Sequence, residues 1–172
     1  MKRYLPLAAL SLWAGCVAAQ ALPAYGCDSP ESKLLDFWVG DWELSHAGPD
    51  GKPVKSRNRI SKILDGCAVL EEFAGGTGTP LKGHSVSVFD KATKRWRQTW
   101  VDNTAAYLDF VGSVEDGNMV FARDAERQGR RLRQRMVFRD VQADSLTWLW
   151  QGSQDDGKTW TTQWEIAYRR AK

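Results

Sequence analysis

The sequence predicts an all-β fold of about ten antiparallel strands, closed into one barrel, with a short N-terminal helix capping one end. Turn-forming clusters recur about every ten residues, as is typical of short strands joined by tight turns. No later stretch keeps an apolar i, i+3, i+4 pattern long enough for a helix. Such short connections make neighbouring strands antiparallel, and many strands in a small domain must close or form two layers to hide their edges. The turn signals lie at 48–51, 65–66, 75–78, 90–93, 102–103, 115–118, 127–129, 142–145 and 155–157.

Residues 1–21 are predicted to be a secretory signal peptide. A basic start precedes an apolar stretch and small residues, so cleavage is expected near Ala19 or Ala21. The alternative is a lipoprotein signal that would anchor the chain at Cys16, although Trp13 stands where leucine is usual. The apolar stretch is too short for a transmembrane segment. Both alternatives place the protein in the periplasm or outside the cell.

Residues 22–172 have the length of a single domain with one core, and no linker or low-complexity segment divides them. Without the leader, 22 basic residues stand against 21 acidic ones, so the mature chain is nearly neutral. This balance gives no support to nucleic acid as a partner. The arginine row formed by Arg131, Arg133, Arg135 and Arg139 is therefore interpreted as a solvated outer strand face rather than a nucleic-acid surface.

Two cysteines remain in the mature chain, Cys27 and Cys67. An even count in an oxidising compartment favours a structural disulfide. A metal site is not expected, because only His46 and His84 could join the cysteines and their spacing is long.

The first predicted element is a helix of about two turns beginning after Ser29. Ser29 is a suitable N-cap and Pro30 fits the first turn. Gly40 limits its length, and Trp38 and Trp42 lie on either side of that glycine. The sequence leaves two roles open for these tryptophans, a ligand platform or a plug that closes the fold.

Alternation along the later strands assigns an inner face that is rich in tryptophan. Three polar side chains fall in register with the aromatic residues, namely Gln98, Gln134 and Thr162. Leaving such groups unpaired in the interior costs roughly 1–3 kcal/mol each, so they are paired, solvated or bound to a ligand. The residues assigned to the inner face are Trp96, Gln98, Trp100, Leu132, Gln134, Met136, Phe138, Leu146, Trp148, Trp150, Trp160, Thr162, Trp164, Ile166 and Tyr168.

One of the adjacent carboxylates Glu71 and Glu72 must point inward, because they follow each other in a predicted strand. If Val69 points inward, so does Glu71; the opposite register places Glu72 inside. An inward carboxylate needs a partner, and Arg57 or Arg59 on the preceding strand is the expected one.

Residues 153–160 match the Asp-box pattern S-x-D-x-G-x-T-W, which occurs once here. Its Ser and Asp side chains suit hydrogen bonds to turn amides, so we interpret it as a structural hairpin. The glycine-rich stretch at 75–78 lacks the G-K-[ST] of a phosphate loop. No serine-hydrolase or zinc-protease motif is recognisable.

Gly40-Asp41-Trp42 resembles the G-x-W signature of calycins, the lipocalin-like barrels. In that group the tryptophan packs at the closed barrel end beneath an arginine from near the last strand. The resemblance therefore implies that Trp42 is structural, with Arg169 or Arg170 as its partner.

More closely, the chain resembles the bacterial family called domain of unknown function 1579, which is calycin-like and related in fold to nitrobindin. Nitrobindin-type haem binding uses a histidine late in the chain. No histidine follows His84, so haem is not expected and no other cofactor is predicted. The matching stretches are 36–43, 59–73, 89–103, 116–121 and 153–160.

We expect the barrel to bind a small, partly apolar molecule, because ten closed strands leave room for one such ligand. One alternative is an enzyme that uses Glu71 or Asp102 as acid–base and Gln98 as an orienting donor. Another is a filled barrel with a structural or interaction role, which would lack a pocket of about 300 Å³ or more. Ligand identity and oligomeric state are not predicted. The expected pocket residues are Trp96, Gln98, Trp100, Trp148, Trp150, Trp164, Tyr168 and Glu71.

Overall fold

The computed structural model describes residues 26–48 and 50–172. The predicted signal peptide, its cleavage sites at Ala19 and Ala21, and the alternative anchor at Cys16 lie outside the described residues. Within the described ranges, no helix has the length and apolar character needed to cross a membrane.

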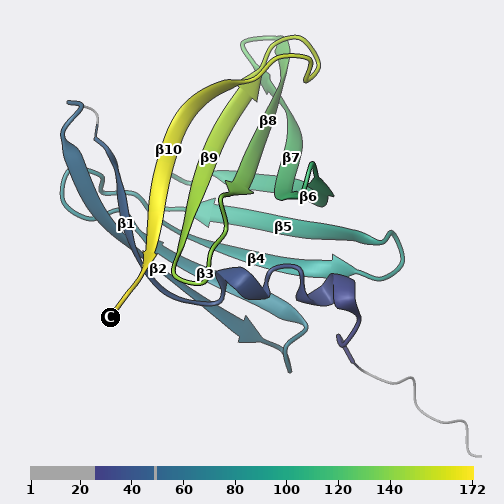
Figure 1. Ribbon diagram of the computed structural model, residues 1–172. Helices are drawn as coiled ribbons and strands as arrows, with labels where there is room; N and C mark the ends of the chain where they lie inside the picture. Colours follow the sequence, from purple (N-terminus) through teal and green to yellow (C-terminus); the bar gives the residue numbers. More distant parts are fainter. Residues whose placement is uncertain (1–25, 49) are drawn as a thin grey trace, which may run out of the picture.

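Ten antiparallel strands form a closed barrel, as the sequence predicts (Figure 1). Each strand pairs with its neighbours in the chain, and β1 pairs with β10 to close the barrel. Short turns make this meander order the simplest solution. The strands are β1 (Gly40–Ala47), β2 (Pro53–Ile63), β3 (Ala68–Ala74), β4 (Lys82–Asp90), β5 (Arg95–Asp102), β6 (Tyr107–Glu115), β7 (Asn118–Arg127), β8 (Arg130–Arg139), β9 (Ser145–Ser153) and β10 (Thr161–Arg170).

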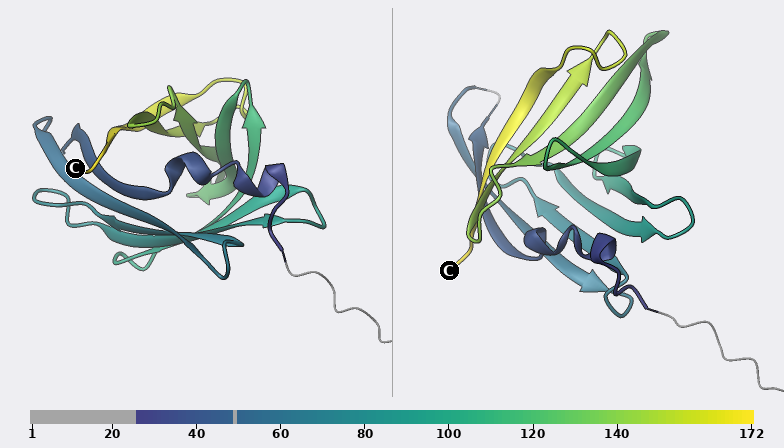
Figure 2. Two further views of the ribbon diagram at one scale, coloured as in Figure 1. Left: turned by 60° about the horizontal axis from the view of Figure 1, so that its bottom comes forward. Right: turned by 45° about the vertical axis from the view of Figure 1, so that its right-hand side comes forward.

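The predicted N-terminal helix consists of two short 3₁₀ turns, η1 (Pro30–Lys33) and η2 (Asp36–Trp38). Ser29 caps the first turn, because its hydroxyl accepts a hydrogen bond from the backbone N–H of Ser32 at 3.3 Å. The purple helical segment lies across one end of the barrel (Figures 1 and 2). Leu35 and Trp38 are fully buried there, so the segment closes that end.

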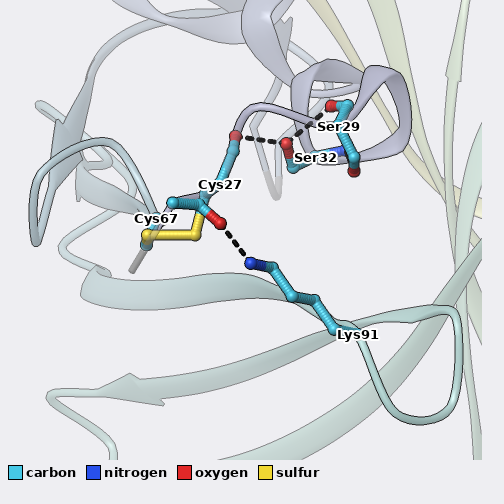
Figure 3. Close-up of a disulfide and its surroundings, with 6 residues drawn as sticks. Cys27, Ser29, Ser32, Cys67 and Lys91 are labelled. Atoms are coloured by element: carbon cyan, nitrogen blue, oxygen red, sulfur yellow. Dashed lines mark hydrogen bonds between the residues drawn. A yellow bond between two sulfur atoms is a disulfide. The ribbon is translucent and has the colours of Figure 1, made fainter. Parts of the chain in front are cut away.

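The predicted disulfide between Cys27 and Cys67 is present (Figure 3). It joins the segment before η1 to the turn between β2 and β3, with the two Cα atoms 5.1 Å apart. The bond closes a loop of 40 residues, which stabilises the fold by about 4 kcal/mol on the chain-entropy model. Lys91 adds a second tie, since its ammonium donates to the carbonyl of Gly26.

A β-bulge in β10 changes the face assignment made from the sequence. The register shifts between Thr162 and Trp164, so that Gln163 is an extra residue on this strand. Before the bulge, Thr162 is exposed and accepts a hydrogen bond from Gln151, while Trp160 stacks against Arg135. The prediction that Trp160 and Thr162 continue the inner face is therefore wrong, because one extra residue reverses the alternation.

The outer face of β8 is also less solvated than predicted. Arg133 and Arg135 are half-buried, and the Arg135 guanidinium lies 4.0 Å from the centre of the Trp160 ring. Beside them, a small apolar cluster is buried that is separate from the barrel core. Its members are Val120, Val137 and Leu149.

Candidate functional site

The barrel interior holds a cavity of about 260 Å³. This volume is below the value of about 300 Å³ that was expected to separate a ligand pocket from a filled barrel. The filled-barrel alternative therefore stands, and the cavity has room only for a molecule smaller than a drug-sized ligand. Two larger hollows, of about 440 and 610 Å³, lie on the barrel surface and are lined by outward residues such as Glu43 and Arg57. The interior cavity is lined by Trp38, Glu71, Phe73, Leu81, Trp100, Asp102, Leu108, Phe110, Met136, Trp148, Trp150, Trp164, Ile166 and Tyr168.

Aromatic rings from several strands form most of this wall. Trp148 and Trp150 follow each other on the inner face of β9, with nearly parallel rings whose centres are 6.4 Å apart. The ring of Trp164 on β10 lies edge-on to the ring of Trp148, with the ring centres 5.9 Å apart. The centre of the Phe73 ring on β3 lies 6.1 Å from the ring centres of both Trp164 and Trp100. Edge-to-face contacts of this kind hold the rings in fixed orientations.

The Trp100 ring lies over Gly83 on β4, the residue that pairs with Asp102. A Cβ atom at Gly83 would lie 2.1 Å from the Trp100 ring, so any larger residue would push the indole away. The indole Nε1 donates to Oδ2 of Asp102 at 2.9 Å. Ring and carboxylate are therefore positioned together at this side of the cavity.

Glu71 is the inward carboxylate, as the first register predicts, and Glu72 is exposed. Its expected arginine partners were wrong: both are exposed on the outer face, and Arg59 pairs with Asp41 at 2.8 Å. Alternation along β2 explains the error, because residues 57 and 59 point away from the interior while residue 58 points into it.

Neutral groups surround the Glu71 carboxylate instead. Asn58 Nδ2 donates to its Oε1 at 2.7 Å, and Ser85 Oγ donates to its Oε2 at 2.6 Å. Burial raises the pKa of Glu71 to about 7, although these two hydrogen bonds oppose the shift. Asn58 also donates to the Tyr168 hydroxyl at 3.1 Å. Burial, and then the charge of Glu71, raise the pKa of Tyr168, so its phenol stays protonated.

Asp102 is the second carboxylate of the cavity, and its pKa is shifted down whereas that of Glu71 is shifted up. Burial alone would raise its pKa, but hydrogen bonds from Thr104, Trp100 and the Ala106 amide lower the pKa of Asp102 to about 2. Its carboxylate is thus ionised at any physiological pH.

Two of the expected pocket residues lie outside the cavity lining. Trp96 is buried near the helical end, where its Nε1 donates to the carbonyl of Glu31 at 3.1 Å. Gln98 is buried and donates to the Ser87 hydroxyl at 2.9 Å. The remaining six expected residues all line the cavity.

The polar side chains that suggested a pocket are satisfied by the protein itself. Gln98 pairs with Ser87, and Gln134 accepts from Arg123 at 3.0 Å. Thr162, as described above, faces outward. These polar residues therefore do not mark the cavity, and the carboxylates do.

Neither histidine lines the cavity. His46 is buried on β1, with Nε2 2.9 Å from the Ser56 hydroxyl, and its ring packs edge-on against Trp164 at 5.0 Å. His84 is exposed on the outer face of β4. Among the residues that the structure describes, no group of three or more His, Cys, Asp or Glu side chains is placed to hold a metal ion.

The closed end of the barrel is organised around Trp42. The Arg170 guanidinium lies 3.9 Å above the centre of its ring, whereas Arg169 is exposed. Arg170 also donates to the carbonyls of Phe37 and Ala143, at 2.9 and 3.1 Å. A Cβ at Gly40, whose φ is +134°, would lie 2.2 Å from the guanidinium. The positive φ favours glycine at this position, and a larger residue would also displace the guanidinium from its place over Trp42.

A family model described as "Protein of unknown function (DUF1579)" matches residues 28–170, which include the whole barrel. The chain belongs to this family. A search of curated proteins finds no match. The closed ten-stranded barrel is compatible with the calycin-like fold that the resemblance implies.

In this DUF1579 barrel, sequence reasoning missed several residues that shape the site. Asn58 and Ser85 hold Glu71, and alternation along β2 and β4 could have placed both on the inner face. Phe73 was identifiable in the same way, because it follows Glu71 by two residues on β3. Trp38 lines the cavity from η2, and a strand pattern carries no signal for it.

Proposed function

We propose that this protein binds a small, partly apolar molecule inside the barrel. The observation that carries the proposal is the composition of the cavity wall, in which eight aromatic rings surround a space of about 260 Å³. Binding pockets are typically apolar with a few placed polar groups, and here Glu71 and Asp102 are the charged candidates for that role.

We further propose that binding takes place outside the cytoplasm. The disulfide between Cys27 and Cys67 supports this compartment, because such bonds persist in oxidising surroundings. The predicted signal peptide points the same way. The ligand is expected to bind without haem or another cofactor, since both histidines are directed elsewhere.

A second candidate function is catalysis in the same cavity. The pKa of about 7 for Glu71 favours it, because a general acid or base works best when its pKa is near the operating pH. Asp102, with a pKa of about 2, would be a weak base. The lining includes no Ser, Cys, Lys or His, so this candidate lacks the usual pair of a nucleophile and an adjacent base and ranks second.

Native mass spectrometry of protein purified from its own host tests binding directly. We expect a small molecule to remain with the folded protein. In parallel, tryptophan fluorescence should change when small lipophilic and aromatic compounds are added, because five of the cavity-lining rings are indoles. Repeated absence of a bound molecule, together with fluorescence unmoved by the panel, would refute the proposal.

A further inference from the structure

The cavity combines two kinds of negative surface. The faces of its eight aromatic rings carry the negative part of their quadrupole. Its two ionisable side chains other than tyrosine are the carboxylates Glu71 and Asp102, and its lining includes no Lys, Arg or His. The wall is therefore arranged for a positive charge that the lining residues do not supply.

Glu71 is the buried carboxylate of this wall. Its side chain is buried, with 8 % of its surface exposed, and both hydrogen-bond donors to it are neutral. Buried carboxylates normally have a cationic partner or several donors. Each carboxylate oxygen accepts one bond here and has capacity for another. Beside it, Asn58 Oδ1 is buried without a hydrogen-bond partner among the residues that the structure describes.

Asp102 supplies a second charge through Trp100. Its Oδ2 accepts the indole N–H at 2.9 Å, and a carboxylate at that position makes the ring face more negative. The register places Trp100 and Glu71 next to the same residue, because Ser85 on β4 pairs with both. The Trp100 ring and the Glu71 carboxylate thus belong to one side of the cavity.

Two basic side chains contact rings of the cavity wall, Arg123 and His46. The Arg123 guanidinium lies 5.9 Å from the Phe110 ring and donates to Gln134 through one Nη, while its buried Nε has no hydrogen-bond partner among the described residues. His46 contacts the Trp164 ring and is bonded to Ser56. Neither residue lines the cavity, and among the described residues the hydrogen bonds to the Glu71 carboxylate come from Asn58 and Ser85, not from a basic group.

We infer that the ligand is an organic cation, a substituted ammonium with apolar groups, whose charge lies against Glu71 and the surrounding tryptophan rings. This inference rests on the proposed binding function and names its ligand class. Aromatic cages bind alkylated ammonium groups through cation–π attraction, which is strongest with tryptophan. The apolar groups of such a cation would occupy the rest of the aromatic wall.

A pair of matched probes tests the inference on the unmodified protein. Benzyltrimethylammonium and neopentylbenzene have nearly the same shape and differ in the positive charge. We expect the cation to bind at least about tenfold more tightly in a fluorescence titration at pH 8. Equal or tighter binding of neopentylbenzene would overturn the inference and leave the binding function standing. If neither probe nor any member of the lipophile panel binds, both proposals fail.

Variants then locate the charge. In Glu71→Gln combined with Asp102→Asn, the preference for the cation should fall to about twofold or less, while affinity for neopentylbenzene stays within about twofold. Glu72→Gln is the matched control, because Glu72 is exposed on the outer face, and it should leave both affinities unchanged. Melting temperatures verify that each variant is folded. A cation preference that survives in the double variant would overturn the assignment to these carboxylates.

Discussion

Tryptophan is used in two different ways at the closed end of the barrel and in its cavity. At the closed end, Trp42 is stacked by the guanidinium of Arg170 at 3.9 Å, and its Nε1 donates to the carbonyl of Trp38 at 2.7 Å. In the cavity, the rings of Trp100, Trp148 and Trp150 face a space whose lining includes no basic residue. Tryptophan therefore completes the fold at the closed end and forms the wall of a cavity in the interior.

The two regions differ in whether the chain itself supplies the partner of each side chain. A side chain with a partner in the chain serves the fold, and one without such a partner is a candidate for binding. The ring of Trp42 and the donors of Arg170 are satisfied within the chain, so nothing remains for a ligand to supply. Glu71 has only neutral partners, and its burial is a net cost to folding whenever it is ionised. Sites that keep such a cost are candidates for function rather than for stability.

The largest expected effect is the loss of stability in Trp42→Ala. Trp42 has 1 % of its surface exposed, and truncating a buried tryptophan costs about 3–5 kcal/mol. Urea unfolding followed by circular dichroism measures the change, and affinity for a cavity ligand should persist in the folded fraction. An unchanged melting temperature with abolished binding would show that Trp42 belongs to the binding site instead.

The second effect is a pH-dependent penalty from Glu71. The pKa of Glu71 is about 7 in the folded state against an ordinary value of 4.5 for glutamate, so between these two pH values the folded state holds a proton that the unfolded state has lost. The contribution of Glu71 to the free energy of unfolding is therefore fully present below pH 4.5 and is lost as pH rises through 7, by about 3 kcal/mol in total. Urea titrations between pH 4.5 and pH 8 measure this slope.

Glu71→Gln should remove that slope, because glutamine keeps the shape without ionising. The variant is expected to gain stability relative to the unmodified protein as pH rises from 5 to 8. Glu72→Gln, one residue away on the exposed face, should retain the original pH dependence. If the free energy of unfolding of Glu71→Gln differed from that of the unmodified protein by the same amount at every pH, the raised pKa of Glu71 would be contradicted.

Adjacent arginines provide a third test, at the closed end. Arg170→Ala removes the stacked guanidinium and its hydrogen bonds to the carbonyls of Phe37, Val39 and Ala143, and should cost about 2–3 kcal/mol. Arg169→Ala removes an exposed side chain of the same type and should change stability by less than about 0.5 kcal/mol. Equal losses in thermal unfolding would contradict the assignment of Arg170 as the partner of Trp42.

The sequence predicted the barrel well because turn spacing and alternation are local signals. The strand count, the closing helix and the disulfide follow from residues close together in the chain or from a simple cysteine count. Partners across the sheet were harder to predict. Charge alone favours Arg57 and Arg59 as partners of Glu71, although residue 58 is the one that faces inward.

Departures from regular geometry also escaped sequence reasoning. The bulge near Gln163 reverses the faces of Trp160 and Thr162, and the residue types around it give no warning. Trp96 and Gln98 were correctly placed inside the barrel, yet the depth at which the cavity begins depends on how the helical segment fills one end. Such filling is a property of the packed structure rather than of any strand pattern.

The smallest loss of stability is expected when a tryptophan that faces the cavity is replaced. This test separates the tryptophans of the cavity from Trp42 at the closed end most clearly. Trp148→Phe exchanges a half-buried indole beside an open space, so it should cost about 1 kcal/mol or less. Affinity for benzyltrimethylammonium should still fall about threefold to tenfold, because phenylalanine is a weaker cation–π partner than tryptophan. Trp160→Phe is the control, since its ring stacks on Arg135 outside the barrel. A similar loss of affinity in both variants would mean that the change acts through stability and not through the cavity wall.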